Sequence, residues 1–340
     1  MHNVRRIEAD RYAIILAGGN ATRLLPLTRR TSGRPIPKQF CPIIGERTLL
    51  AQTRCRVALK VDRHRTIVVV TRSHEDFYRD QLSASSDPNL LVQPDNRGTA
   101  AAILFAVLRV AKRDPHAVVS VFPSDHYVDN EELFMCHADL AMRMANLHRQ
   151  QLVLLGITPE RAESGYGWIE PAGSVCERST LLRVAQFWEK PPESLARHLW
   201  QRGCLWHSFV MAGTARAFLT ITFRALPELK RTVVRIWPAV GTPDEHEAME
   251  VAYANIPCRD LAEDVLAQNA ADLVVVPVEG LYWNDLGDPR RVYETLARIQ
   301  IRPGWTTQRT ALNSNNFIRE SRPQIRAANC SSNRYPQRTR

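Results

Sequence analysis

Short apolar runs alternate along the chain with longer amphipathic stretches. The runs are rich in Val and Ile and are bounded by Gly, Pro, Asp or Arg, as buried strands of a parallel sheet usually are. Predicted strands cover Tyr12–Leu16, Thr66–Val70, Ala117–Phe122, Leu152–Ile157 and Leu273–Val278. Predicted helices cover His74–Leu82, Thr99–Lys112 and Glu131–Arg149. This alternation predicts an α/β protein with an open sheet flanked by helices.

The end of this pattern is sharply marked. A last helix is predicted over Arg291–Ile299, with Asp288 as its cap and Pro289 in its first turn. Beyond Pro303 apolar residues become sparse, and residues 302–340 hold eight Arg, one Glu and no Lys or Asp. We therefore expect one domain over residues 10–300 and a basic, disordered tail over residues 301–340.

Composition and charge exclude several classes of protein. The 340 residues are 44% hydrophobic and 24% charged, unlike a disordered or collagen-like chain. The formal net charge is +10, but residues 302–340 carry +7, so the other 301 residues carry only +3. A nearly neutral body gives little support for nucleic-acid binding, and an Arg-rich tail that binds RNA is the alternative.

Cysteine spacing and apolar runs bear on the cellular location. The seven Cys form no CxxC pair, which argues against a disulfide framework or a zinc cluster and favours a reduced cytosol. The first residues lack the apolar segment of a signal peptide. Apolar runs stay well short of the ~18 residues that a membrane-spanning helix needs. We expect a cytoplasmic protein that does not bind membranes.

A glycine pair follows the first predicted strand directly. Open α/β sheets bind ligands at the carboxyl ends of their strands, where Gly18 and Gly19 would let backbone amides approach phosphate oxygens. Arg23 would add a bidentate phosphate contact. Lys38, one of only five Lys against 40 Arg, follows in a Pro-fixed segment and could neutralise a polyphosphate. Spacing alone leaves an ordinary tight turn open as the other interpretation of the glycine pair.

Two aspartates far apart in sequence are candidates for one metal site. Asp125 and Asp285 are each expected to end or follow a strand at the same sheet edge. Mg²⁺ is commonly held by one or two carboxylates together with phosphate oxygens of a substrate. For a single Asp after a strand, helix capping is the alternative. Together with the glycine loop and Lys38, the pair predicts Mg²⁺ binding.

These motifs resemble those of the sugar-nucleotide pyrophosphorylases, and among them the mannose-1-phosphate guanylyltransferases. Residues 16–28 resemble the opening signature LAGG-x-G-x-R-L-x-P-L-[ST], and residues 37–40 match P-K-Q-F. Further segments match later family motifs in the same order: residues 93–100, 123–126, 165–169, 187–191, 206–208 and 283–287. The matches extend over residues 12–300.

The resemblance implies both a fold and a reaction. The fold would be Rossmann-like, of the GT-A type, with a mixed, mostly parallel sheet flanked by helices. The reaction would join mannose 1-phosphate and GTP to give GDP-mannose and pyrophosphate, with Mg²⁺ as cofactor. A phosphate oxygen of the sugar phosphate would attack the α-phosphorus in line, so no protein nucleophile is needed. Catalysis would then depend on positioning and charge stabilisation.

The resemblance also implies roles for single residues. The expected catalytic residues are Arg23 and Lys38, which would offset charge on the pyrophosphate, and Asp125 and Asp285, which would hold Mg²⁺. The expected nucleotide-binding residues are Leu16, Ala17, Gly18, Gly19, Gln93, Asn96, Gly98 and Thr99. The expected sugar-phosphate-binding residues are Gly167, Glu189, Lys190 and His207. An exposed ion pair of little energetic value is the alternative for Glu189 and Lys190.

The chain departs from the family pattern at three places. Ala21 stands where Gly is common, which would cost about 1 kcal/mol if that residue has a positive φ. His207 replaces an Asn that would bind sugar hydroxyls, so the sugar is less well determined than the reaction. Residues 257–270 lack the Tyr and final Lys of a family motif, and Asp260 or Asp264 could take over part of its role.

Two other functions stay open. The chain could use another pair of substrates, such as UTP or dTTP with glucose 1-phosphate, or it could be a regulatory homologue that binds a sugar nucleotide without turnover. The cupin-type isomerase domain of longer relatives is expected to be absent, because only 40 residues follow residue 300. A homo-oligomer is compatible with the sequence, which does not determine the oligomeric state.

Overall fold

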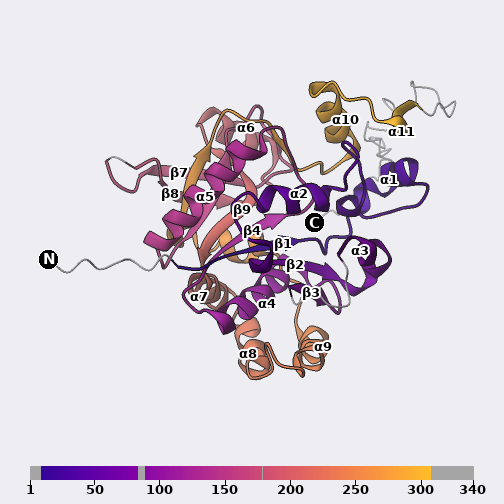
Figure 1. The fold of residues 1–340 in the computed structure, drawn as a ribbon. Helices are drawn as coiled ribbons and strands as arrows, with labels where there is room; N and C mark the ends of the chain where they lie inside the picture. Colours follow the sequence, from indigo (N-terminus) through magenta and orange to yellow (C-terminus); the bar gives the residue numbers. More distant parts are fainter. Residues whose placement is uncertain (1–8, 83–88, 178, 308–340) are drawn as a thin grey trace, which may run out of the picture. The chain divides into compact units, whose positions relative to one another are not determined.

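A computed structural model describes residues 9–82, 89–177 and 179–307 of the chain (Figure 1). Residues up to 301 form one compact unit. Residues 302–340 are grouped in a second unit, in which the described helix is α11 (Gly304–Thr307). From residue 308 onward, the expected disordered tail lies outside the described residues.

Nine of the described strands form one mixed sheet, in the order β3-β2-β1-β4-β9-β6-β10-β8-β7. Strands β3, β2, β1 and β4 pair in parallel, as do β6 and β10. Strand β9 runs antiparallel to both β4 and β6 and therefore joins the two parallel groups. The strands are β1 (Arg11–Leu16), β2 (Thr66–Thr71), β3 (Leu90–Gln93), β4 (Val118–Pro123), β6 (Leu152–Ile157), β7 (Trp168–Ser174), β8 (Leu182–Trp188), β9 (Leu205–Thr214) and β10 (Leu273–Val278).

All five strands predicted from apolar runs are confirmed, as β1, β2, β4, β6 and β10, with ends within one residue of the prediction. The sequence pattern missed β3 and β7 to β9. Strand β3 has only four residues, and β9 mixes polar and apolar residues although nearly all of it is buried. Strand β8 pairs with β7 and β10, β7 also pairs with β9, and both strands carry several exposed residues. Their partners across the sheet, and not an apolar run, hold these strands in place.

Helices cover both faces of the sheet. Figure 1 shows α2 and α5 on one face and α4, α7, α8 and α9 on the other. The helices of this unit are α1 (Leu25–Ser32), α2 (Leu49–Val57), α3 (Glu75–Leu82), α4 (Gly98–Arg113), α5 (Glu131–Leu147), α6 (Glu193–Gln201), α7 (Ala215–Ala225), α8 (Pro227–Ile236), α9 (Glu245–Asn255) and α10 (Pro289–Arg298). The predicted helices are confirmed as α3, α4, α5 and α10. The predicted cap is confirmed too, because Asp288 Oδ1 accepts a hydrogen bond from the Arg291 amide at 3.0 Å.

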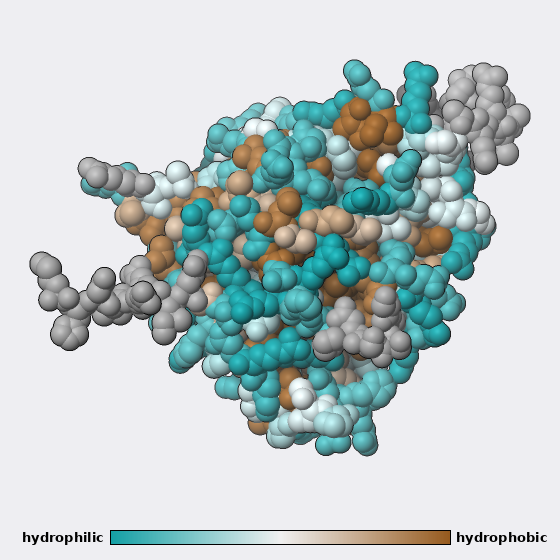
Figure 2. Space-filling model, in the orientation of Figure 1, coloured by the Kyte–Doolittle hydropathy of each residue, from teal (hydrophilic) through white to brown (hydrophobic). Residues whose placement is uncertain are grey.

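Helix α4 packs against the middle of the sheet and shields one of its faces from solvent. Its residues are apolar on almost every side, and most of them are buried between the sheet and α7. On the outside, hydrophobic residues form separate patches among hydrophilic ones on the face that Figure 2 draws. In the described part of the chain, no helix combines the length and apolar character needed to cross a bilayer.

A second, two-stranded sheet lies beside the ends of the main one. It pairs β5 (Tyr127–Val128) with β11 (Trp283–Asn284), in antiparallel fashion. Asp125 precedes β5 and follows β4, while Asp285 follows β11. The expectation that both aspartates follow strands of one sheet edge is therefore wrong for Asp285. The small sheet brings it to the carboxyl end of β4 instead.

Candidate active site

A cavity of about 430 Å³ opens at the carboxyl ends of β1 and β4. Of the residues predicted from the sequence, those that line it are Arg23, Lys38, Thr99, Asp125, Gly167, Glu189, Lys190, His207 and Asp285. Those that do not line it are Leu16, Ala17, Gly18, Gly19, Gln93, Asn96 and Gly98. Most of the residues expected to bind phosphates and sugar are thus brought together in one cavity, whereas most of the expected nucleotide-binding residues lie outside its lining.

The loop after β1 is held from behind by side chains. Gln39 Nε2 donates to the carbonyls of Ala17 at 3.0 Å and Gly19 at 2.7 Å. Thr71 Oγ1 donates to the Gly18 carbonyl at 3.1 Å. A Cβ on Gly18 would lie 2.7 Å from Gln93 Nε2 and 2.8 Å from Thr71 Oγ1. Glycine at position 18 therefore allows the loop to pack directly on the ends of β2 and β3.

Ala21 adopts the conformation in which an alanine is strained. Its φ is 48° and its ψ is 38°, so the residue lies in the left-handed region just before the short 3₁₀ turn Thr22–Leu24. Because the φ of Ala21 is positive, the Cβ of alanine costs about 1 kcal/mol relative to glycine at this position. The loop still reaches the cavity, because Ala21 and the exposed Arg23 both line it.

Lys38 connects the two aspartates. Its ammonium lies 3.2 Å from Asp125 Oδ2 and donates to the backbone carbonyls of Asp285 at 2.5 Å and Leu286 at 3.2 Å. The side chain is 9% exposed, so this charge is held in a fixed place. The three contacts match the three N–H donors of an ammonium. Lys38 thereby ties the end of β4 to the segment that follows β11.

Both aspartates present carboxylate oxygens to the cavity, and each faces a protein cation. Arg291 Nη1 donates to Asp285 Oδ1 at 2.8 Å and Oδ2 at 2.9 Å. Burial acts to raise the pKa of Asp285, but the nearby charges of Lys38 and Arg291 outweigh it and lower the pKa below its ordinary value. Asp125 is less buried, with 27% of its side chain exposed. Carboxylate oxygens can accept more than one contact, so the pair fits Mg²⁺ bound jointly with substrate phosphates.

Glu189 and Lys190 do not form an ordinary surface ion pair. Lys190 Nζ lies 2.7 Å from Glu189 Oε1, and the Glu189 side chain is only 15% exposed. Burial raises the pKa of Glu189, whereas pairing with Glu189 outweighs burial and raises the pKa of Lys190. A Cβ on Gly167 would lie 2.9 Å from Glu189 Oε2, so the glycine allows this carboxylate to approach the backbone. The pair borders the cavity from the end of β8.

Around the same cavity lie buried polar atoms that have no hydrogen-bond partner in the described part of the chain. They are His126 Nδ1, Trp206 Nε1, His207 Nε2 and Trp283 Nε1. Burial lowers the pKa of His126 to about 4 and that of His207 to about 3, so both imidazoles are neutral near pH 7. An unpartnered buried polar group costs roughly 1–3 kcal/mol. A polar ligand or water in the cavity can supply partners for these atoms.

Tyr166 packs the indoles of this cluster together. Its ring lies 4.9 Å from the ring of Trp206 and 5.1 Å from that of Trp283, both in edge contact. His126 lies edge-on to Trp283 at 5.2 Å. Sequence analysis matched the motifs that contain these residues but assigned no role to His126 or Trp283. Their common signal, a polar aromatic residue beside a motif aspartate, could have singled them out.

The two aspartates left open in residues 257–270 differ in position. Asp260 lines the cavity, accepts a hydrogen bond from Thr99 Oγ1 at 3.0 Å, and caps a single π-helical turn, Ala262–Leu266. Asp264 does not line it and accepts instead from the Asp260 amide at 2.7 Å. A Cβ on Gly98 would lie 2.1 Å from the Arg259 carbonyl, so this segment packs directly on the start of α4.

Comparison with known proteins places the chain in a family. A sequence model described as "Nucleotidyl transferase" matches residues 12–301. The xanthan biosynthesis protein XanB of Xanthomonas campestris pv. campestris strain B100 is 31% identical over 283 residues, which cover 82% of this chain and 58% of the relative. The mannose-1-phosphate guanylyltransferase of Escherichia coli K12 is 29% identical over 295 residues, 84% of this chain and 60% of that protein. This chain thus spans about three fifths of the length of these relatives.

A solved structure supports the same assignment. The structure described as mannose-1-phosphate geranyltransferase from Thermus thermophilus superimposes with a TM-score of 0.73 and 28% identity, covering 86% of this chain and 80% of that one. The glucose-1-phosphate thymidylyltransferase structure from Bacillus anthracis, described as putative, shares the fold at a TM-score of 0.53 and 14% identity. The resemblance inferred from the motifs is confirmed. The chain belongs to the nucleotidyl transferase family.

Proposed function

We propose that the chain transfers the nucleotidyl group of GTP to mannose 1-phosphate, giving GDP-mannose and pyrophosphate, on a Rossmann-like fold of the GT-A type. The observation that carries the proposal is the single cavity in which Lys38, Asp125 and Asp285 lie together with the Glu189–Lys190 pair. Relatives of about 30% identity include a mannose-1-phosphate guanylyltransferase, which supports this pair of substrates over others.

In the proposed reaction an oxygen of the sugar phosphate attacks the α-phosphorus of GTP. The new P–O bond forms as the bond to the bridging oxygen of the β-phosphate breaks, and pyrophosphate leaves with that electron pair. The attacking phosphate is already ionised, so the protein needs no nucleophile or general base. Positioning and charge compensation supply the rate enhancement.

The cations of the cavity are proposed to contact different phosphates of the two substrates. Lys38 is fixed by three protein contacts and offsets charge through proximity. Arg23 is exposed at the mouth and is free to follow the pyrophosphate as it leaves. Lys190 has 60% of its side chain exposed and orients the phosphate of the sugar. Asp125 and Asp285 hold Mg²⁺, which when bound would neutralise charge on the reacting phosphates.

The nucleotide is proposed to lie along the ends of β1 and β3. Gly18 and Gly19 would approach its phosphates, Gln93, Asn96, Gly98 and Thr99 would lie around its base and ribose, and Leu16 and Ala17 complete the proposed nucleotide-binding set. Asn96 Nδ2 donates to the Gly18 carbonyl at 3.4 Å, and Thr99 reaches the cavity itself. Because Gly18 and Gln93 are packed together, the base would have to approach from the cavity side of the loop.

The sugar is proposed to lie against Gly167, Glu189 and His207. Hydroxyl groups both donate and accept hydrogen bonds, and the neutral imidazole of His207 offers an unpartnered Nε2 for such a contact. The Glu189 carboxylate can accept from two hydroxyls. The replacement of Asn by His at position 207 is compatible with a hydroxyl contact, since both side chains donate and accept.

The test is pyrophosphate release by the purified chain. Mannose 1-phosphate is supplied with GTP, ATP, UTP, CTP or dTTP in turn, with Mg²⁺ and then with EDTA, and the panel is repeated with glucose 1-phosphate. We expect release with GTP and mannose 1-phosphate that EDTA abolishes. Release with another pair would keep the reaction and change its specificity. A folded sample that is silent across the panel would contradict the proposal and favour a regulatory homologue.

A further inference from the structure

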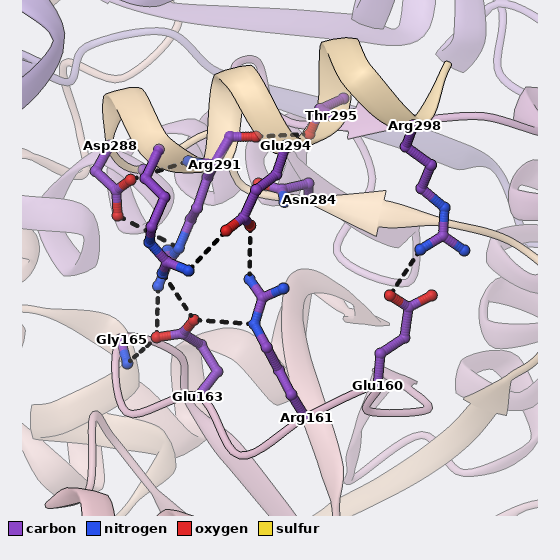
Figure 3. A network of polar contacts seen from close by, with 12 residues as sticks. Glu160, Arg161, Glu163, Gly165, Asn284, Asp288, Arg291, Glu294, Thr295 and Arg298 are labelled. Atoms are coloured by element: carbon purple, nitrogen blue, oxygen red, sulfur yellow. Dashed lines mark hydrogen bonds and ion pairs between the residues drawn. The ribbon is translucent and has the colours of Figure 1, made fainter. Parts of the chain in front are cut away.

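One buried guanidinium joins two walls of the cavity. Arg291, in the first turn of α10, has only 3% of its side chain exposed. Besides its contacts with both oxygens of Asp285, its Nη2 lies 2.9 Å from Glu163 Oε1 and its Nε lies 3.5 Å from Asp288 Oδ2 (Figure 3). The guanidinium carbon also lies 4.3 Å from the centroid of the Tyr166 ring.

The contacts of Arg291 reach elements that are far apart in sequence. Glu163 accepts a hydrogen bond from the Gly165 amide at 3.2 Å, at the start of the turn that carries Tyr166 and Gly167 into the cavity. Asp285 accepts one from the Gly287 amide at 2.8 Å. The same guanidinium therefore contacts the carboxylate that organises the sugar wall and the carboxylate proposed to bind metal.

Two glycines show how closely the guanidinium is fitted. A Cβ on Gly165 would lie 2.4 Å from Arg291 Nη2, and a Cβ on Gly287 would lie 2.9 Å from Nη1. Both glycines line the cavity, one in each wall. The guanidinium thus lies between two backbone segments that have no room for a side chain at Gly165 or Gly287. It therefore contacts both walls of the cavity directly.

Arginine is the one side chain with the chemistry for this place. Its planar group presents five N–H donors in a fixed fork, so it can serve carboxylates on different sides and also stack on a ring. Although burial acts to lower the pKa of Arg291, the charge of Asp285 and the other acidic neighbours outweighs it and raises the pKa. A Lys at this position would keep the charge but would lose the fork.

We propose that Arg291 is a positioning residue that couples the sugar wall, Glu163 to Gly167, to the Asp285 carboxylate. It contacts no substrate itself; it sets the separation and orientation of two groups that do. The inference rests on the proposed function, because it assigns these walls to sugar phosphate and metal. A purely structural ion pair would instead affect stability and leave the properties of the folded enzyme unchanged.

The test compares Arg291→Lys and Arg291→Met with a matched control, Arg290→Met. Arg290 is the neighbouring residue on α10, has 57% of its side chain exposed, and contacts Glu163 and Glu294 at the edge of the same network. Each folded variant is assayed for kcat, for KM of mannose 1-phosphate, for the Mg²⁺ concentration that gives half-maximal rate, and for mannose 1-phosphate binding by calorimetry without Mg²⁺.

We expect Arg291→Lys to fold and to lose about tenfold or more in kcat, with a weaker calorimetric affinity for mannose 1-phosphate and a higher Mg²⁺ requirement, as losses of groups that orient metal ligands usually cause. Arg291→Met should lose more. A further variant, Arg291→Ala, should regain part of its activity when guanidinium ion is added. Arg290→Met should stay within about twofold of wild type, as an exposed pair predicts.

The outcomes separate the inference from the proposed function. If wild type releases pyrophosphate and a folded Arg291→Lys matches it in kcat, KM, Mg²⁺ requirement and affinity, the inference is overturned and the proposed function stands. If the wild-type chain neither turns over nor binds mannose 1-phosphate, both are overturned. If Arg291→Met fails to fold, the judgement rests on Arg291→Lys, which keeps the charge and most of the volume.

Discussion

The two sides of the cavity use opposite kinds of polar group. On one side Lys38, Asp125 and Asp285 carry full charges, and each is paired with a charge of the other sign. On the other side His207 and Trp283 are neutral and buried, and His207 Nε2 and Trp283 Nε1 have no hydrogen-bond partner among the described residues. A buried charge is tolerated only when it is paired, whereas a neutral polar group can be left unpaired at lower cost. We propose that the charged side serves the phosphates and that the neutral side, together with the Glu189 carboxylate next to it, serves the hydroxyls.

The two sides also arise from different parts of the fold. The charged side comes from segments that follow β4 and β11 and from the turn that carries Lys38. The neutral side is built largely within strands, His207 in the antiparallel β9 and Trp283 in the short β11. The charged groups thus lie beyond strand ends, whereas the ring nitrogens belong to residues within strands. Four changes, in order of expected effect, test whether this contrast has functional meaning.

The largest effect is expected from Lys38→Met, which removes the central charge of the charged side. We expect kcat to fall by about 100-fold or more, because the phosphates lose a fixed cation and Asp125 loses its partner. Steady-state kinetics on a variant with an unchanged circular dichroism spectrum measures this loss. Lys60→Met, which changes an exposed lysine outside the cavity, is the control and should behave as wild type. A Lys38→Met enzyme with near-normal kcat would remove Lys38 from the mechanism.

Asp125→Asn should have the next largest effect. The amide keeps the shape of the side chain but weakens binding of a divalent cation, so we expect kcat to fall roughly 10- to 100-fold and the Mg²⁺ requirement to rise. Titrating MgCl₂ at saturating substrates measures both quantities. The exposed Asp76 on α3 offers the control Asp76→Asn. An unchanged Mg²⁺ titration in Asp125→Asn would contradict a metal role for this carboxylate.

On the neutral side, His207 should affect how the free energy of unfolding depends on pH. Its pKa in the folded chain is lowered by burial to about 3 from an ordinary value of 6.5. The unfolded chain therefore binds more protons between these values, so the free energy of unfolding should fall as the pH drops below 6.5. His207→Asn should show a smaller fall between pH 7 and pH 5 in urea titrations, and KM for the sugar phosphate should change severalfold.

The exposed His198 supplies the matched control for this pH experiment. His198→Asn should lose stability with acid as steeply as wild type, because it leaves the buried His207 imidazole in place. Equal pH dependence in wild type and His207→Asn would show that the buried imidazole does not contribute to acid sensitivity.

The smallest effect is expected from Ala21→Gly, which touches neither side directly. Relief of the left-handed alanine should outweigh the greater flexibility of glycine in the unfolded chain and raise the free energy of unfolding by about 0.5 kcal/mol. The urea midpoint measures this change. Since the residue lies at the cavity edge, kcat should change by less than about threefold. A loss of stability would mean that the loop relaxes to another conformation around the alanine.

Much of the parallel part of the fold could be predicted from the sequence. Strands β1, β2, β4, β6 and β10 are buried on both faces, so each shows as an apolar run bounded by polar residues. The cap of α10 at Asp288 is equally local, because the capping residue and its partner are three positions apart. The motif residues Arg23, Lys38, Asp125 and Asp285 could likewise be singled out, and they do line one cavity.

Only the tertiary structure decided which residues face one another. Strand β9 lies between β4 and β6 although its sequence shows no clear strand pattern, and it brings His207 to the cavity. Glu163 and Arg291 are 128 positions apart, and nothing in either segment indicates their contact. Asp260 and Asp264 could not be distinguished until the segment was packed on α4. The periodicity of hydrophobic residues depends on the local chain and indicates which positions are buried. Contacts between side chains that are distant in sequence depend instead on the order in which the strands enter the sheet.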